Sequence, residues 1–318
     1  MAEKKIPIRI VVVTMFDPEP ATGWPSELTR WVERVPLDER LPFPLGERDL
    51  HLNRDKAVLA LVTGVGNTKA AAAIMALGLD PRFDLSRAYF LVAGIAGANP
   101  ESMSVGSAAW IDWVIDGDLA HDIDPREMPA GWKTGRLPLG KSEPYAQPPS
   151  TLTATMAYRL DPDLVDWAMK LTHGVELGDS PALAKFRANF PKHEAARRPP
   201  FVLTGALVAT NSLWHGWHYN AWAADWAKYW TGGQARFTAS AMEDLGIIMA
   251  HRALARAGYV TAERLLILRT ASNYTVPIEG VGVAASLAGE MRDGFSGFVP
   301  ALEAAWRVGS RVVQEILE

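Results

Sequence analysis

The chain has 318 residues, of which 48% are hydrophobic, and this composition is typical of a folded globular protein with a substantial core. Its formal net charge of −4 and its pI near 6.0, without a long basic run, argue against a protein that binds nucleic acid electrostatically. The lack of cysteine excludes disulfides, zinc–thiolate sites and thiol nucleophiles.

The first part of the chain alternates strand-like and helix-like segments. Residues 8–15 have the density of β-branched side chains that is typical of a buried strand, and the acidic Asp17 and Glu19 follow it, with a proline between them. Residues 57–78 predict a strand, a glycine turn at Gly64 and an alanine-rich helix. Further extended structure is predicted in two segments, 89–100 and 106–124.

The second part begins with a weaker pattern. Residues at about 125–200 are rich in proline and predict an irregular insertion, with a helix near 162–172. The tryptophans at 222, 226 and 230 are spaced for one helical face, and packing in a core is the usual reason for such a stripe. Strands are expected at 201–216 and 265–268, and amphipathic helices at 245–258 and 298–318. We therefore expect a single α/β domain over 1–318, with a mostly parallel or mixed sheet.

Polar residues stand at the ends of two of these apolar runs. Met242-Glu243 precedes the helix-like run, and Ser272-Asn273 closes the strand-like run. The edge of an open α/β sheet where such ends converge is where ligands bind. A carboxylate and a carboxamide suit a sugar diol and a heterocycle, because the first accepts two hydrogen bonds while the second both donates and accepts. Each also has a plain structural explanation, as a helix-start acid or a turn residue.

Other motifs are weak. The turn Gly64-Val65-Gly66 lacks the third glycine of a dinucleotide-binding fingerprint and the Gly-Lys-Ser/Thr ending of a P-loop, so we expect no cofactor. His121 with Asp122 and Asp124 does not match a usual metal-ligand spacing, so no metal is expected. There is also no nucleophile elbow of a serine hydrolase.

A series of short segments carries a more specific signal: VVVTMFDPE, LPFPLG, VTGVGNTKAAAAIMALGLDPRFDL, AGIAGANP, GDLAHDID, KYWTGGQ, AMEDLG and LRTASNY. In this order they resemble the purine nucleoside permease (NUP) branch of the purine nucleoside phosphorylase and nucleosidase superfamily, over nearly the whole chain. The resemblance implies a mixed sheet that curls into a distorted barrel surrounded by helices, with an active site built from loops at the strand ends.

The resemblance also implies roles for the polar pairs. Met242 is expected to pack beneath the ribose, and Glu243 to accept hydrogen bonds from its 2′ and 3′ hydroxyls. Ser272-Asn273 occupies the loop where many relatives place Ser-Asp, whose acid protonates purine N7. An amide cannot deliver a proton, but Asn273 can hydrogen-bond N7 and a 6-oxo group and so stabilise negative charge on the departing base. This departure favours 6-oxopurine nucleosides.

The remaining substrate contacts implied by the resemblance come from three loops. The segment 209–214 resembles the base-stacking loop, and AGIAG resembles the small-residue loop beside the base and the sugar. The expected contacts from these two loops and from the glycine turn are Asn211, Leu213, Trp214, Gly94, Ala96, Gly97 and Gly64.

The identity of the nucleophile follows from charge. Phosphorylases place arginines and a hydroxyl near the first strand, whereas this chain places Asp17 and Glu19 there, which disfavours a phosphate dianion. Water is therefore the preferred nucleophile, with Asp17 or Glu19 as general base. The prediction is cleavage of the N-glycosidic bond of purine nucleosides. Alternatives are a phosphorylase that uses phosphate, a soluble nucleoside-binding protein that assists uptake, and a member of the fold that has lost activity.

Assembly and location are less constrained. Superfamily members often complete the pocket with a neighbour's residues, so we expect a homo-oligomer, with a weak preference for a dimer and with residues 123–132 as the contributing region. No apolar stretch reaches the roughly 18 residues that span a bilayer, so no membrane span is expected. No signal-peptide pattern precedes the first strand. The compartment stays open: cytoplasmic, or periplasmic if a signal was removed.

Overall fold

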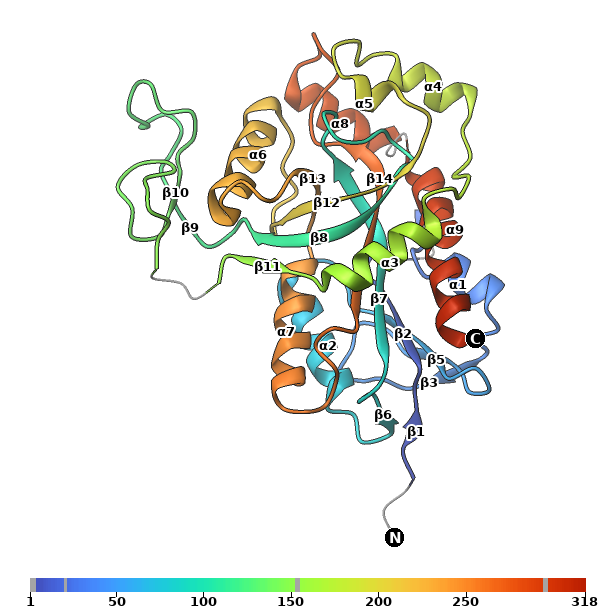
Figure 1. The fold of residues 1–318 in the computed structure, drawn as a ribbon. Coiled ribbons are helices and arrows are strands. Elements are labelled where there is room, and N and C mark those ends of the chain that lie inside the picture. Colours follow the sequence, from blue (N-terminus) through green and yellow to red (C-terminus); the bar gives the residue numbers. More distant parts are fainter. Residues whose placement is uncertain (1–3, 20–21, 152–154, 294–296) are drawn as a thin grey trace.

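The computed structural model describes residues 4–19, 22–151, 155–293 and 297–318. Its centre is a mixed ten-stranded sheet (Figure 1). The strands of this sheet are β2 (Ile10–Thr14), β3 (Glu39–Leu41), β4 (Leu50–Asn53), β5 (Val58–Val62), β7 (Tyr89–Ala98), β8 (Ala108–Asp116), β11 (Ala157–Arg159), β12 (Val202–Ala209), β13 (Phe237–Ala241) and β14 (Leu265–Tyr274).

Within this sheet, β7, β14, β8, β12 and β13 pair in a ring and close a barrel. The ring is mixed, because β7 runs parallel to β14 while β13 runs antiparallel to β7. β2, β5, β4 and β3 extend the sheet outward from β7, and β11 is added at β8. This arrangement confirms the expected mixed sheet that curls into a distorted barrel.

Helices cover the sheet on several sides (Figure 1). They are α1 (Thr29–Arg34), α2 (Asn67–Gly78), α3 (Pro162–Thr172), α4 (Pro181–Arg187), α5 (Glu194–Arg197), α6 (Trp217–Thr231), α7 (Asp244–Arg256), α8 (Val283–Asp293) and α9 (Phe298–Leu317). α2 packs against α7, and α9 packs along β7 and β14. None of the helices in the described ranges is long and apolar enough to cross a membrane.

Two short sheets lie outside the central one. β1 (Ile6–Pro7) pairs with β6 (Phe83–Asp84) near the N-terminus. β9 (Ala120–Asp122) and β10 (Arg136–Pro138) form an antiparallel pair in an arm that projects from the body of the molecule (Figure 1). The arm contains the region from 123 to 132 that was expected to reach a neighbouring subunit.

Apolar runs form the buried strands and helices. Every residue of β2 and β5 is buried, as their uninterrupted β-branched and aliphatic sequences require. α3 has the bounds predicted for the helix in the insertion, and it begins where the Asp161 carboxylate accepts a hydrogen bond from the backbone N–H of Leu164 at 2.8 Å. Trp222 and Trp226 on α6 are buried in a second apolar cluster, which confirms the core role of the tryptophan stripe.

One strand end differs from the expectation. Ser272-Asn273 does not close the strand, because β14 continues to Tyr274 and pairs with β7 along its whole length. Ala271 pairs with Ala96 and Asn273 pairs with Gly97, so Ser272 is the extra residue of a β-bulge. Bulges re-aim side chains and are common beside active sites. The polar pair is therefore presented by an irregularity within the strand rather than by a turn after it.

Candidate active site

A cavity of about 280 Å³ lies at the carboxyl ends of the central strands, the position at which α/β sheets bind ligands. Its wall is mostly apolar with a few convergent polar groups, as is typical of small-molecule sites. The residues of its wall that the sequence had singled out are Met242, Glu243, Ser272, Asn273, Leu213, Trp214, Ala96 and Gly97. The structure thus brings together side chains that lie far apart in the sequence.

Glu243 is a buried carboxylate at one side of this cavity, directly before α7. Its Oε2 accepts a hydrogen bond from Nη2 of Arg269 at 2.9 Å, and its Oε1 accepts one from the backbone N–H of Gly66 at 3.3 Å. Burial raises the pKa of the Glu243 carboxyl, and the Arg269 guanidinium opposes that rise. The carboxylate is thereby held at the cavity wall, where it can accept hydrogen bonds from a ligand.

Arg269 organises the charges around the cavity from inside β14. The fully buried guanidinium donates to both oxygens of Asp244, at 3.0 and 2.7 Å, in addition to Glu243. Its Nη1 donates to the backbone oxygen of Ile95 at 2.9 Å. Sequence reasoning missed this residue, although an arginine directly after the apolar run Leu265–Leu268 is a recognisable signal, since charged residues are buried only when paired.

Glu27 is a second buried carboxyl in the cavity wall, and no pattern in the sequence distinguishes it from other acidic residues. Its Oε2 accepts from the backbone N–H groups of Met15 and Phe16, at 2.7 and 3.0 Å, and its Oε1 accepts from that of Ile95 at 2.8 Å. Burial raises the pKa of Glu27 to about 7, and the charge of Arg269 opposes the rise. The side chain is therefore poised to exchange a proton near neutral pH.

Gly94 makes the close approach of these groups possible. A Cβ atom at this position would lie 2.1 Å from Cε of Met15, and 2.8 Å from both Nη1 of Arg269 and Oε1 of Glu27. Any larger residue would displace the buried ion pairs. The structure therefore places Gly94 behind the cavity wall, as a spacer for its polar groups rather than as one of the lining residues.

Asp17 and Glu19 do not reach the cavity. Both carboxylates bind Arg48, at 2.7 Å from Nε and 3.0 Å from Nη2, and they line a separate hollow on the outer side of the first loop. The loop carries these residues outward after β2 and returns at Glu27, whose carboxylate binds the backbone at the end of that strand. The acidic residue at the cavity is thus ten positions beyond Asp17 in the same loop.

The other two predicted contacts also lie outside the cavity wall. Gly64 has a φ of 76° and sits beside the side chains of Glu47 and Lys69, so it shapes the turn before α2. Asn211 accepts a hydrogen bond at its Oδ1 from the backbone N–H of Asn67 at 2.9 Å, and its Nδ2 donates to Asp118 at 2.8 Å. Asn211 therefore ties the loop after β12 to the start of α2.

Asn273 and the loop after β12 form the opposite side of the cavity. The Ser272 hydroxyl donates to Oδ1 of Asn273 at 3.0 Å, and Nδ2 of Asn273 donates to the backbone oxygen of Tyr274 at 3.2 Å. Trp214 is buried against Trp222 and Phe237, whereas the neighbouring Leu213 is 50% exposed at the rim. This side combines an amide with flat apolar surface, which suits a heterocyclic base.

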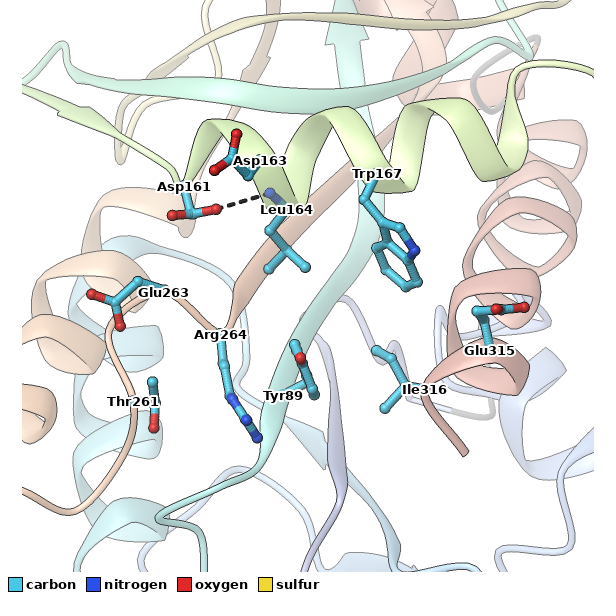
Figure 2. A pocket seen from close by; sticks show the side chains of 10 residues that line it. All are labelled: Tyr89, Asp161, Asp163, Leu164, Trp167, Thr261, Glu263, Arg264, Glu315 and Ile316. Carbon is cyan, nitrogen blue, oxygen red and sulfur yellow. Dashed lines mark hydrogen bonds between the residues drawn. The ribbon is translucent and has the colours of Figure 1, made fainter. Parts of the chain in front are cut away.

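A larger hollow of about 640 Å³ lies at the amino-terminal ends of β7 and β14 (Figure 2). Of its acidic side chains, Asp161 accepts the hydrogen bond that begins α3. Arg264 donates to the backbone oxygen of Arg87 and lies over the ring of Tyr89. Because sheets of this kind bind ligands at the other strand ends, this hollow is not our candidate site. Over the described residues, no group of three or more His, Cys, Asp or Glu is arranged to hold a metal ion.

The fold is shared with solved nucleosidases. The 5′-methylthioadenosine/S-adenosylhomocysteine nucleosidase of Neisseria meningitidis matches with a TM-score of 0.55 at 17% identity, over 97% of this chain and 100% of that one. Futalosine hydrolase of Helicobacter pylori matches with a TM-score of 0.54 at 13% identity, over 96% and 98% of the two chains. At these identities the likeness shows the fold class alone, which is the α/β fold of these nucleosidases.

The family follows from the sequence. Residues 7–318 match the model of the purine nucleoside permease (NUP) family, and this chain belongs to that family. A probable purine nucleoside permease of Schizosaccharomyces pombe is 29% identical over 277 residues, which are 84% of this chain and 77% of that protein. The purine nucleoside permease of Candida albicans is 29% identical over 233 residues, or 72% of this chain, and the match spans 57% of its own length.

Proposed function

We propose that this protein cleaves the N-glycosidic bond of purine nucleosides and uses water as the nucleophile. The observation that carries the proposal is one cavity walled by two buried carboxyls, Glu27 and Glu243, by the arginine between them and by the Asn273 amide. The nucleosidases and the hydrolase with the same fold support the reaction class, and the permease relatives support a purine nucleoside as ligand.

The ribose is assigned to the side of the cavity formed by Met242 and Glu243. The Glu243 carboxylate, paired with Arg269, accepts the hydrogen bonds of a sugar diol, and a ligand without these hydroxyls would leave its remaining acceptor positions unsatisfied. Met242 supplies apolar surface beside that carboxylate. Cleavage through an oxocarbenium-like transition state would place developing positive charge on the sugar near these acidic groups, which stabilises it electrostatically.

Glu27 is assigned to the attacking water. Its pKa of about 7 lies where a general base is most effective at neutral pH, because half of the molecules then carry the basic form. Three backbone N–H groups fix the carboxylate, so its orientation does not depend on the substrate. Asp17 and Glu19, which the sequence suggested for this task, are replaced in the proposal by Glu27.

The charges of the cavity favour water over phosphate. Arg269 is the one cationic side chain among the described residues of the wall, and its hydrogen bonds go to Glu243, Asp244 and the backbone of Ile95. A phosphate dianion would therefore meet carboxylates without a free cation. On the other side of the cavity, the Asn273 amide and the rings of the base loop are assigned to the purine, with 6-oxopurines preferred.

The proposal is tested by incubating the protein with inosine, guanosine, adenosine and 5′-methylthioadenosine, each with and without phosphate. Chromatography then follows the free base and the sugar product. We expect free base and free sugar to form at rates that do not depend on phosphate. Nucleosides that remain unchanged in every condition would overturn the catalytic proposal. Formation of a sugar 1-phosphate would assign phosphate as the nucleophile.

A nucleoside-binding role in uptake is a second candidate, because the curated relatives are named permeases. The same cavity would serve it, since ribose and base contacts are needed for binding as much as for cleavage. Calorimetry with inosine separates the two functions. Tight binding without release of free base over hours supports the binding role, whereas turnover in the calorimeter cell supports the enzyme.

A further inference from the structure

A further carboxyl, which is half-buried, lies at the side of the proposed site that is assigned to the purine, and it comes from a different element. Glu290 on α8 shares a side-chain hydrogen bond with Asn273, the amide in the cavity wall. Its Oε2 is buried and has no hydrogen-bond partner among the described residues. Neither the proposed reaction nor the packing of α8 so far accounts for this carboxyl.

The position of α8 against the site is set by further contacts. Ser286 lies one helical turn before Glu290, so the two side chains share a face of the helix. The Ser286 hydroxyl lies 3.0 Å from Nε2 of His215, in the loop that also carries Trp214. Figure 1 shows α8 beside the end of β14. The contacts of Glu290 and Ser286 thus show that this face of α8 lies against the bulge of β14 and the loop after β12 that carries Trp214 and His215.

The hydrogen bonds of Asn273 limit what it can offer to a purine. An amide nitrogen has two N–H groups, and one of those of Asn273 donates to the backbone oxygen of Tyr274 at 3.2 Å. The bond to Glu290 lowers the pKa of that carboxyl, so it is donated by Asn273 to the ionised form. While Glu290 is ionised, both N–H groups are therefore occupied and none is left for N7 of the base.

We propose that Glu290 is a positioning residue of the purine subsite: when ionised it holds the Asn273 amide by a charge-assisted hydrogen bond, and when protonated it is a weaker acceptor that yields one of the amide N–H groups to the purine. Oε2, which has no hydrogen-bond partner in the part of the chain that the structure describes, is the atom that takes up the proton. The neutral form has a second advantage, because it places no negative charge beside a departing base that is itself becoming negative. This inference rests on one part of the proposed function, namely that a purine occupies this side of the cavity.

The surroundings of Glu290 allow this protonation near neutral pH. Burial raises the pKa of Glu290 to about 7, and the Asn273 bond is the one opposing influence. Of the titratable groups near this face of α8, His215 has a pKa lowered by burial, and Tyr274 has a pKa raised by burial, so both are uncharged around pH 7. Glu279, in the segment before α8, is paired with Lys192 at the surface.

The test measures binding of the free base hypoxanthine by calorimetry at pH 6, 7 and 8, and it needs no turnover. If only the protonated form frees the amide, Kd rises about tenfold between pH 6 and pH 8, in proportion to the loss of the competent fraction. E290M cannot accept the hydrogen bond, so its Kd should stay at the low-pH value of the wild type throughout. E290Q is a second neutral variant, in case the methionine disturbs folding, and should also lose the pH dependence.

Two control variants exclude other sources of pH dependence. E279Q removes the exposed carboxyl before α8, and E27Q removes the other cavity carboxyl with a pKa of about 7; both should keep the tenfold change. A pH-independent Kd in the wild type, an unchanged pH dependence in E290M, or no binding of the base overturns the inference. The outcome is separable from that of the proposed function. Binding that depends on pH without nucleoside cleavage would contradict only the proposed function. Cleavage together with pH-independent binding would contradict only the inferred role of Glu290.

Discussion

Glu27 and Glu19 are two acids of the same loop with different surroundings. Glu27 is buried in the cavity wall, whereas Glu19 is exposed and bound to Arg48. A residue that activates water must reach it within hydrogen-bond distance, so only Glu27 has the required position. E27Q is therefore expected to lower kcat for nucleoside cleavage by about 10²- to 10⁴-fold, the range for a lost general base.

E19Q is the matched control for this experiment, because it makes the same chemical change eight residues earlier in the same loop. Steady-state assays with the best nucleoside should show E19Q within about twofold of the wild type. The opposite ranking, with E19Q inactive and E27Q active, would restore the interpretation that the sequence alone had favoured.

Arg269 forms buried ion pairs with two carboxylates beside the cavity. Its removal leaves the buried carboxylates of Glu243 and Asp244 without their partner. Breaking a buried ion pair from one side typically costs about 3 to 5 kcal/mol, so R269M should reduce the free energy of unfolding by about that amount. Urea denaturation measures this free energy.

R264M is the control, at a position just before β14. It should lower the free energy of unfolding by less than about 1 kcal/mol, because it removes a half-buried cation from the ring of Tyr89. Equal losses in the two variants would contradict the assignment.

His251 on α7 makes the protein sensitive to acid. The ring is buried against Phe90, its nitrogens have no hydrogen-bond partner among the described residues, and burial lowers its pKa to about 4. In the unfolded chain the His251 ring binds a proton below about pH 6.5, whereas in the folded protein it stays neutral down to about pH 4. Stability is therefore lost as pH falls from about 6.5 to about 4, by up to about 3 kcal/mol.

The H251L variant should lose the part of the acid sensitivity that His251 causes. The free energy of unfolding is measured by urea at pH 7 and pH 4.5, and the difference between the two pH values is compared between variant and wild type. Glu27 and Glu290 have raised pKa values and act in the opposite direction, but they are present in both proteins and cancel in the comparison. H173Q, at the exposed end of α3, should leave the difference unchanged. A wild-type difference that persists in H251L would refute the account.

At the scale of elements, α3 shows how one side chain sets the start of a helix. Asp161 accepts the hydrogen bond of the Leu164 N–H, and Pro162 follows in the first turn. D161A should lower the free energy of unfolding by about 1 kcal/mol, the usual cost of a lost N-cap, which is measured by thermal or urea unfolding. D163A changes an acid in the same turn that makes no cap bond, so a loss as large as that of D161A would show that charge, rather than capping, is responsible.

Elements with uniform apolar sequence were predictable, and those without it were not. β2, β5, α2 and α3 follow from runs or periodicities that a few residues reveal. β13 has the sequence FTASA, whose small and polar residues are buried only because β12 and β7 flank it. The sequence therefore did not indicate it. The bulge at Ser272 was equally hidden, because it depends on the register with β7.

At the scale of the molecule, the site lies where the barrel closes. β13 meets β7 over the short pairing of Ser240 with Gly97 and of Ala239 with Ala98, and both Ser240 and Gly97 line the cavity. The family resemblance located this region, since Glu243 and Asn273 follow or belong to barrel strands. It did not locate Glu27, whose position is set by backbone donors at the end of β2 and on β7, 68 residues away in the case of Ile95. Such pairings are fixed only by the folded chain.

The glycine spacer at position 94 has a consequence for attempts to change the specificity of this protein. A Cβ atom at position 94 would overlap Met15 and crowd Arg269 and Glu27, so almost no substitution of Gly94 can be accommodated. A library of variants directed at position 94 would consist mainly of destabilised proteins. Leu213 and Val65 at the rim are 50% and 40% exposed, so diversity is best concentrated there, where new substituents can be accommodated without a loss of foldability.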